Sequence, residues 1–186
     1  MVQQTLTLAL VTLFALAPQS APPAPYNGAA DARQLIANAV KVAATDGIRV
    51  LVNWGTNGDE ACAKFLQMQA SSAVDPKFFS LEYKRVYIDV GRADKNLDVA
   101  KAYGVTITAG SLPALTVLDD RGKVLANATA RDFAGPAAVG LKPELYSSFL
   151  SKHQAPAPNA IAQFDEAVTQ AKRDGKLVFV WFSAPW

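Results

Sequence analysis

One helix–turn–strand pattern occurs twice in this chain, and this repetition constrains the fold more than any other feature. Apolar residues recur with the three- and four-residue spacing of a buried helix face over residues 36–43 and again over residues 164–171. An Asp-Gly pair follows each stretch, at positions 46–47 and 174–175, with glycine where a helix favours a left-handed C-cap. Each copy therefore begins with a helix that ends at its glycine.

A continuous apolar run follows each Asp-Gly pair, over residues 50–52 and 178–180. Such runs are typical of strands covered on both faces. The chain therefore contains one complete copy of a module and the opening third of a second. We expect the second strand not to fold in its usual place, since no further strands or helices follow to cover it.

Over the complete copy, starting from its first helix, the pattern predicts the order α-β-α-β-α-β-β-α. Pro143 suits the first turn of the last helix, and the turn at 119–122 joins the last two strands into a hairpin. This order predicts an α/β fold with a mixed central sheet between helices. The expected elements after the first strand are helix 59–72, strand 85–90, helix 96–103, strands 114–118 and 123–127, and helix 143–152.

The N-terminus predicts an export signal. Residues 6–17 form an apolar run that is short for a membrane span, and a proline-rich spacer follows to residue 25. The first four residues carry no Lys or Arg, and the small-residue cleavage sites all precede proline, so an uncleaved anchor over residues 5–17 or a disordered tail remain alternatives. We expect a protein that is periplasmic, secreted or membrane-anchored.

Composition excludes several classes of function. The 186 residues carry 18 Lys and Arg against 16 Asp and Glu without a basic run, so we expect no nucleic-acid partner. Cys62 is the single cysteine and His153 the single histidine, which excludes an internal disulfide. We accordingly predict no metal site and no cofactor.

Five local motifs in this order resemble the thioredoxin superfamily, and most of all its exported members. The resemblance covers about residues 26–152 and implies a three-layer thioredoxin-like sandwich. It also implies domains at 1–25 (signal and spacer), 26–152 (module), 153–160 (linker) and 161–186 (second module). The motifs are the strand 87–90, the helix 98–105, the Leu-Pro-Ala-Leu segment 112–115, the hairpin turn 120–123 and Ser-Ala-Pro-Trp at 183–186.

In active members of the superfamily, a Cys-x-x-Cys pair follows Ala-Pro-Trp directly. This chain ends at Trp186, one residue before that pair. We therefore expect the second module to be truncated. A gene fragment, a chosen chain end, or a selenocysteine codon translated as a stop remain open explanations.

In the complete module, the resemblance aligns Asp59 with the attacking cysteine and Cys62 with the resolving cysteine. Asn53 stands where active members hold a buried acid. Disulfide exchange requires a thiolate to attack and a second thiol to release the mixed disulfide. The module is therefore predicted to be redox-inactive or nearly so. Cys62 is interpreted as a buried, inert residue, with a redox-sensing or mixed-disulfide thiol as the alternative.

The resemblance also implies a docking groove for polypeptide. A cis peptide between Leu112 and Pro113 would form one wall, and Trp54, Gly55 and Gly58 would flank the groove; a core position is the alternative for Trp54. Two functions follow. One is a thiol–disulfide protein of redox or folding context, inactive in this chain, with protein thiols or disulfides as substrates. The alternative is a non-catalytic polypeptide-binding domain, chaperone-like or scaffolding.

Overall fold

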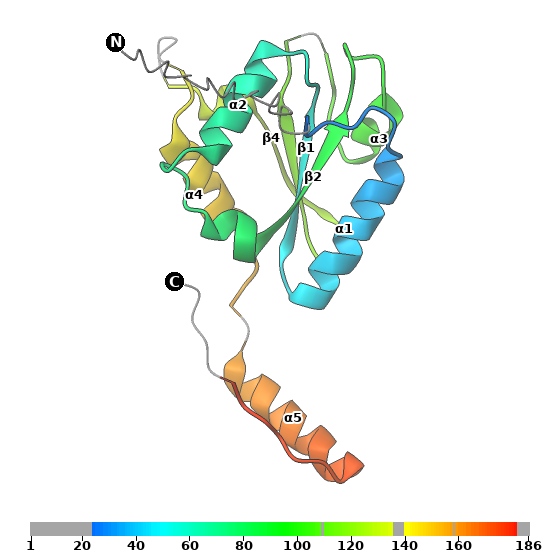
Figure 1. The fold of residues 1–186 in the computed structure, drawn as a ribbon, viewed down its shortest axis with the longest axis vertical. Coiled ribbons are helices and arrows are strands. Elements are labelled where there is room, and N and C mark those ends of the chain that lie inside the picture. Colours follow the sequence, from blue (N-terminus) through cyan, green and yellow to red (C-terminus); the bar gives the residue numbers. More distant parts are fainter. Residues whose placement is uncertain (1–23, 109, 136–139, 158, 182–186) are drawn as a thin grey trace, which may run out of the picture.

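The computed structural model describes residues 24–108, 110–135, 140–157 and 159–181 (Figure 1). The apolar part of the predicted signal and the final Ser-Ala-Pro-Trp lie outside these described residues. No helix in the described part of the chain has both the length and the apolar character needed to cross a membrane.

A four-stranded mixed sheet forms the centre of the module, with the strand order β2-β1-β3-β4. Strand β1 (Arg49–Gly55) is parallel to β2 (Tyr83–Asp89) and antiparallel to β3 (Ala114–Leu118). Strand β4 (Val124–Thr129) is antiparallel to β3 and closes the hairpin. Six consecutive residues of β1 are buried, as expected for a central strand between two helical layers.

Helices cover both faces of this sheet. Helices α1 (Ala32–Asp46) and α3 (Leu97–Ala102) lie on one face, and α2 (Glu60–Ala70) and α4 (Pro143–His153) on the other (Figure 1). Alternate residues of β1 divide between the two cores, with Val52 packed beneath α1 and Leu51 beneath α2 and α4. The chain thus forms the predicted three-layer α/β fold.

The element order follows the prediction, but some boundaries differ. Strand β2 begins two residues earlier than expected, and β4 extends to Thr129. Two short helical segments were not predicted, η1 (Phe78–Glu82, a π-helix) and η2 (Ala130–Phe133, a 3-10 helix). The hairpin turn has the expected form because Gly122 adopts a positive φ of 81° and its N–H donates to the Asp119 carbonyl oxygen at 3.1 Å.

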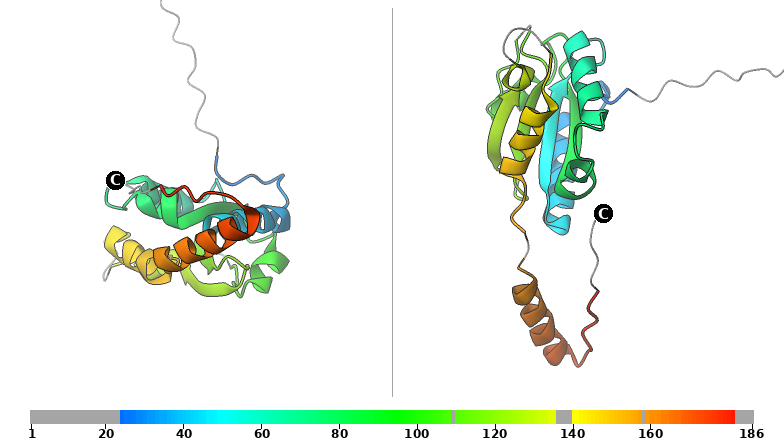
Figure 2. Two further views of the ribbon diagram at one scale, coloured as in Figure 1. Left: turned by 90° about the horizontal axis from the view of Figure 1, so that it is seen from below. Right: turned by 90° about the vertical axis from the view of Figure 1, so that its left-hand side faces the viewer.

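Helix α5 (Ala160–Asp174) follows α4, and Gly175 caps it in the left-handed conformation, as in the first copy. The apolar run after it, which we expected not to fold in its usual place, forms no strand in the described residues up to 181. The segment is instead irregular, with Leu177 98% and Phe179 84% exposed. The physical reason is that a lone strand finds no partner for its backbone N–H and C=O groups. Helix α5 and this segment lie apart from the sheet (Figure 1 and Figure 2, right).

Candidate functional site

The N-terminus of α2 lies just after the carboxyl end of β1, and Asp59 caps it. The Asp59 side chain accepts a hydrogen bond from the Cys62 backbone N–H at 2.8 Å, and its carbonyl oxygen accepts from Ala63 at 3.0 Å. Its φ of −99° and ψ of 128° are the extended values of an N-cap residue. A carboxylate therefore occupies the end of the helix where unpaired N–H groups and the helix dipole favour negative charge.

Cys62 lies one turn into α2, and its side chain is fully buried. Burial raises the pKa of its thiol to about 12, because the charged form loses its hydration. A hydrogen bond from the Thr56 backbone opposes this rise, while the negative charge of Asp59 adds to it. Asp59 and Cys62 thus lie together in the first turn of α2, and burial favours the protonated form of the thiol.

Tyr26 covers the sulfur of Cys62. The sequence pattern did not reveal this role of Tyr26. Its flanking residues are exposed, but Tyr26 itself is only 2% exposed. Asn57 holds its backbone with two hydrogen bonds, accepting from the Tyr26 N–H at 3.2 Å and donating to its carbonyl oxygen at 2.7 Å. The Tyr26 ring also packs edge-on against Tyr87. A tyrosine directly after a proline-rich spacer was the only available signal in the sequence.

Gly55 makes room for this contact. A Cβ atom on Gly55 would lie 2.5 Å from the Tyr26 hydroxyl oxygen and 2.9 Å from the Cys62 sulfur, closer than real contacts allow. Burial raises the pKa of the Tyr26 phenol, and the neighbouring Cys62 thiol adds to this rise. Tyr26, Gly55 and Cys62 therefore form one close-packed cluster that seals the thiol from solvent.

Asn53 belongs to a buried polar network beneath α2 and α4. Its side-chain N–H groups donate to the carbonyl oxygens of Leu51 at 3.3 Å and Val86 at 3.4 Å. Its Oδ1 accepts from Gln69 Nε2 at 3.0 Å, and Gln69 Nε2 also donates to the Tyr146 hydroxyl at 2.7 Å. Neither amide titrates, and burial raises the pKa of Tyr146 further above its ordinary value. The network therefore holds no group that exchanges protons near neutral pH. The sequence did not single out Gln69 or Tyr146.

Trp54 lies in the core rather than on a groove. Its side chain is fully buried, and its indole N–H donates to Thr116 Oγ1 at 2.9 Å. The hydroxyl of Thr116 in turn donates to Asn127 Oδ1 at 2.7 Å. The structure therefore places Trp54 in the core position, which was the alternative in the sequence analysis, and leaves it no surface for a ligand.

The peptide bond between Leu112 and Pro113 is cis, and Pro113 directly precedes β3. The Pro113 carbonyl oxygen accepts from the Ala130 N–H at 3.0 Å. Pro113 is buried, Leu112 is half-buried, and Gly58 lies exposed with open space around its Cα. Among the residues predicted to form the docking groove, Leu112 lines a cavity beside α2.

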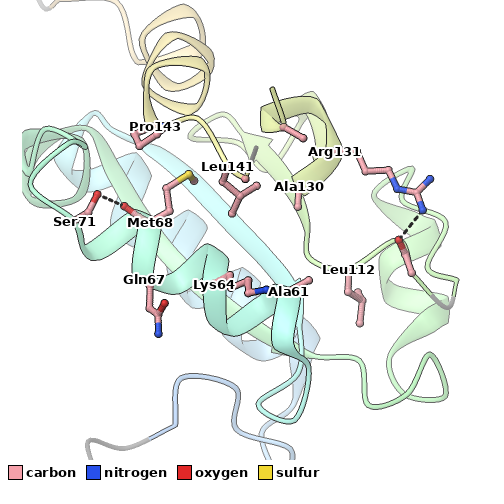
Figure 3. A pocket seen from close by; sticks show the side chains of 13 residues that line it. Ala61, Lys64, Gln67, Met68, Ser71, Leu112, Ala130, Arg131, Leu141 and Pro143 are labelled. Atoms are coloured by element: carbon pink, nitrogen blue, oxygen red, sulfur yellow. Dashed lines mark hydrogen bonds between the residues drawn. The ribbon is translucent and has the colours of Figure 1, made fainter. Parts of the chain in front are cut away.

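That cavity has a volume of about 740 Å³ and lies beside α2 (Figure 3). We call it the α2 groove. Its walls come from α2, the loop before β3, η2 and the segment leading into α4. The lining residues are Ala61, Lys64, Gln67, Met68, Ser71, Gly110, Leu112, Ala130, Arg131, Ala134, Gly140, Leu141 and Pro143.

Within the described ranges, no three His, Cys, Asp or Glu side chains gather closely enough to hold a metal ion. The polar groups at the α2 N-terminus are instead engaged with one another, and the α2 groove is lined largely by apolar atoms. The arrangement can therefore cap a helix, bury a thiol and offer an apolar surface to a ligand.

Comparison with known proteins agrees with this architecture. No family model matches the chain, and no curated protein matches it. Among solved structures, it is similar to a disulphide isomerase from Xylella fastidiosa Temecula1, with 26% identity and a TM-score of 0.60 over 71% of this chain and 98% of that one.

The chain is also similar, more distantly, to other solved structures. They include a DsbH oxidoreductase (19% identity, TM-score 0.41, 74% of this chain and 92% of that one). A thioredoxin from Thermus thermophilus shows 15% identity and a TM-score of 0.42, over 62% of this chain and 81% of that one. The mixed sheet, its helical layers and the likeness to the Xylella protein show that this chain has the thioredoxin fold, in support of a place in the thioredoxin superfamily.

Proposed function

We infer that the module of residues 26–152 serves in thiol–disulfide exchange or protein folding without itself performing dithiol exchange. The observation that carries this proposal is the carboxylate of Asp59 at the helix N-cap, bonded at 2.8 Å to the Cys62 N–H. That position is where a cysteine would be activated by the helix N-terminus. A carboxylate there stabilises the helix but forms no disulfide.

The remaining sulfur does not replace the missing one. Burial raises the pKa of the Cys62 thiol to about 12, so the protonated form dominates at neutral pH. The thiolate is the attacking species in exchange, and Tyr26 covers the sulfur as well. Asn53 supplies no proton acceptor beneath it. All three features support a module without exchange activity.

Reduction of insulin disulfides tests the proposal. The chain should be inactive, and Asp59→Cys should introduce activity, because it creates a Cys-x-x-Cys pair at the start of α2. Asn53→Asp combined with Asp59→Cys should be faster still, because it restores a titratable group near the pair.

Asp59→Cys combined with Cys62→Ser is the matched control, since it has a thiol at the half-buried position 59 but no resolving partner. Turnover of insulin by the unchanged chain would overturn the proposal. Continued inactivity of Asp59→Cys, with the fold intact by circular dichroism, would show that the Asp59 carboxylate is not what prevents exchange.

Polypeptide binding is the second candidate, and the α2 groove favours it. The groove begins at Ala61, beside the α2 N-terminus, and passes Leu112, which directly precedes the cis-proline. Ligand sites of this kind are mostly apolar and range over several hundred Å³. Binding of an unfolded, cysteine-free polypeptide, measured by fluorescence anisotropy, tests this function separately from any redox activity.

We also propose export and a second module. The apolar run and proline-rich spacer before Tyr26 support export, and the shared caps of α1 and α5 support a repeat. Cell fractionation with and without residues 1–25 tests export.

A further inference from the structure

One wall of the α2 groove is the outer surface of α2, which does not include Cys62. Ala61, Lys64 and Met68 lie along one stripe of α2, at successive turns of the helix, and form one wall together with Ser71, the residue after the helix (Figure 3). Cys62 lies off this stripe, since its sulfur packs inward against Gly55 and Tyr26. A ligand in the groove therefore contacts the surface of α2 without reaching the thiol.

Apolar side chains form most of the groove. Met68 and Leu141 lie close together at one end, near Pro143, and Leu112 lies at the other (Figure 3). Met68 is nearly buried, while Leu112 and Leu141 are half-buried and so keep apolar surface open to the groove. Methionine is flexible and polarisable, and it adapts to apolar side chains of different shapes. This part of the groove fits a large apolar side chain.

The charged residues in the lining are both cations, Lys64 and Arg131. Arg131 is exposed and is positioned from η2 by a bond from its Nη2 to the Gly110 carbonyl oxygen at 3.2 Å. Lys64 pairs with Glu60 at 2.7 Å, but both side chains are mostly exposed, and such surface pairs contribute little free energy. Glu60 itself does not line the groove. Among the described lining residues, the charged side chains are thus two cations, and no carboxylate is among them.

We propose that the α2 groove binds an extended polypeptide segment that carries a large apolar side chain next to one or more acidic residues. The apolar side chain lies against Met68 and Leu141, and the carboxylates lie near Lys64 and Arg131. The inference rests on the proposed polypeptide binding and adds to it the class of ligand. Charge complementarity of this kind sets the preference among peptides and the rate of their association.

Two fluorescent, cysteine-free probe peptides test the proposal on the full chain. Both contain phenylalanine and leucine, one alternating with glutamate and the other with lysine. The glutamate peptide should bind at least about tenfold more tightly, and the difference should shrink as salt is added. Arg131→Glu and Lys64→Glu should each weaken its binding by about tenfold.

Lys41→Glu is the matched control. It makes the same change in net charge from an exposed position on α1, across the sheet, and should leave binding unchanged. If Lys41→Glu weakens binding as much as the two groove variants do, the groove is not the site and the inference fails.

The remaining outcomes separate the two proposals. Equal binding of both peptides would overturn the preference for acidic segments and leave polypeptide binding intact. Absence of binding by either peptide would overturn polypeptide binding together with the inference. The insulin assay would still decide whether the module performs exchange.

Discussion

Helices α1 and α5 are near-copies in local structure and opposites in their surroundings. Each has 15 residues, an Asx residue at its N-cap and a left-handed glycine at its C-cap. Helix α1 buries Ile36 and three alanines against the sheet, whereas no residue of α5 is buried. Phe164, which matches Ile36 in the repeat, is 49% exposed. Local sequence thus determines a helix and its ends, and tertiary contacts determine what the helix contributes to stability.

The largest expected difference between the module and α5 is in the rate at which a cysteine reacts with a thiol reagent. A cysteine introduced by Phe164→Cys in a Cys62→Ala chain lies on an exposed helix, whereas Cys62 is sealed and its pKa is raised to about 12. At pH 8, Cys62 should react with a thiol reagent about a thousandfold more slowly than the introduced cysteine.

Stopped-flow labelling measures both rates, with denatured chains as the control in which the two cysteines react alike. Because the folded pKa lies far above the ordinary value, the Cys62 rate should keep rising with pH beyond pH 9, where an exposed thiol levels off. Equal native rates would contradict the burial of Cys62. Tyr26→Ala should raise the labelling rate of Cys62 and leave that of the introduced cysteine unchanged.

The next largest expected difference between α1 and α5 is the loss of unfolding free energy when a matching apolar side chain is truncated. Ile36→Ala removes a fully buried side chain and should lower the free energy of unfolding by about 2–5 kcal/mol. Phe164→Ala should change it by less than about 0.5 kcal/mol, because the side chain contributes nothing to the packed core. Urea unfolding of the two variants checks this. A comparable loss for both would mean that α5 packs onto the module.

Substitution of the C-cap glycines of α1 and α5 should have a smaller effect on stability, caused by backbone strain. Gly47 has a φ of 68° and Gly175 a φ of 62°, and a Cβ atom on either would meet no neighbour within 4 Å. Alanine at either position therefore costs only the left-handed conformation, about 1–2 kcal/mol. Gly47→Ala should lower the unfolding midpoint of the module. Gly175→Ala should leave that midpoint in place and only reduce helicity, as circular dichroism would reveal.

Removal of the N-cap side chains of α1 and α5 should have the smallest effect on global stability. Asp31 accepts from the Gln34 N–H at 3.0 Å, and Asn159 accepts from the N–H groups of Ile161 and Ala162 at 3.1 Å. Asp31→Ala should cost about 1 kcal/mol of global stability. Asn159→Ala should cost nothing measurable in the same urea experiment, and a global loss there would show that α5 unfolds together with the module.

The sequence alone predicted much of the module because its signals are local. Glycines at helix ends, a turn at Asp119–Gly122 and the continuous apolar run of β1 each depend on residues close in the chain. The same holds for Asp59 and Cys62, which are three residues apart on one helix turn. These features follow from backbone geometry and helix capping, which nearby residues largely determine.

Contacts between distant residues were not predictable in this way. Tyr26 meets Cys62 across the β1–α2 corner, and Gln69 joins Asn53 to Tyr146 between two helices. No periodicity encodes such contacts, because they exist only once the layers have packed. Packing also decided that Trp54 lies in the core, that Arg131 and Lys64 line one groove, and that α1 is buried while α5 is exposed. The sequence determined the helices with their caps and the apolar runs that can become strands. Tertiary structure decided which run found a partner strand and which faces of the helices and strands became buried or stayed exposed, since both depend on neighbours far away in the chain.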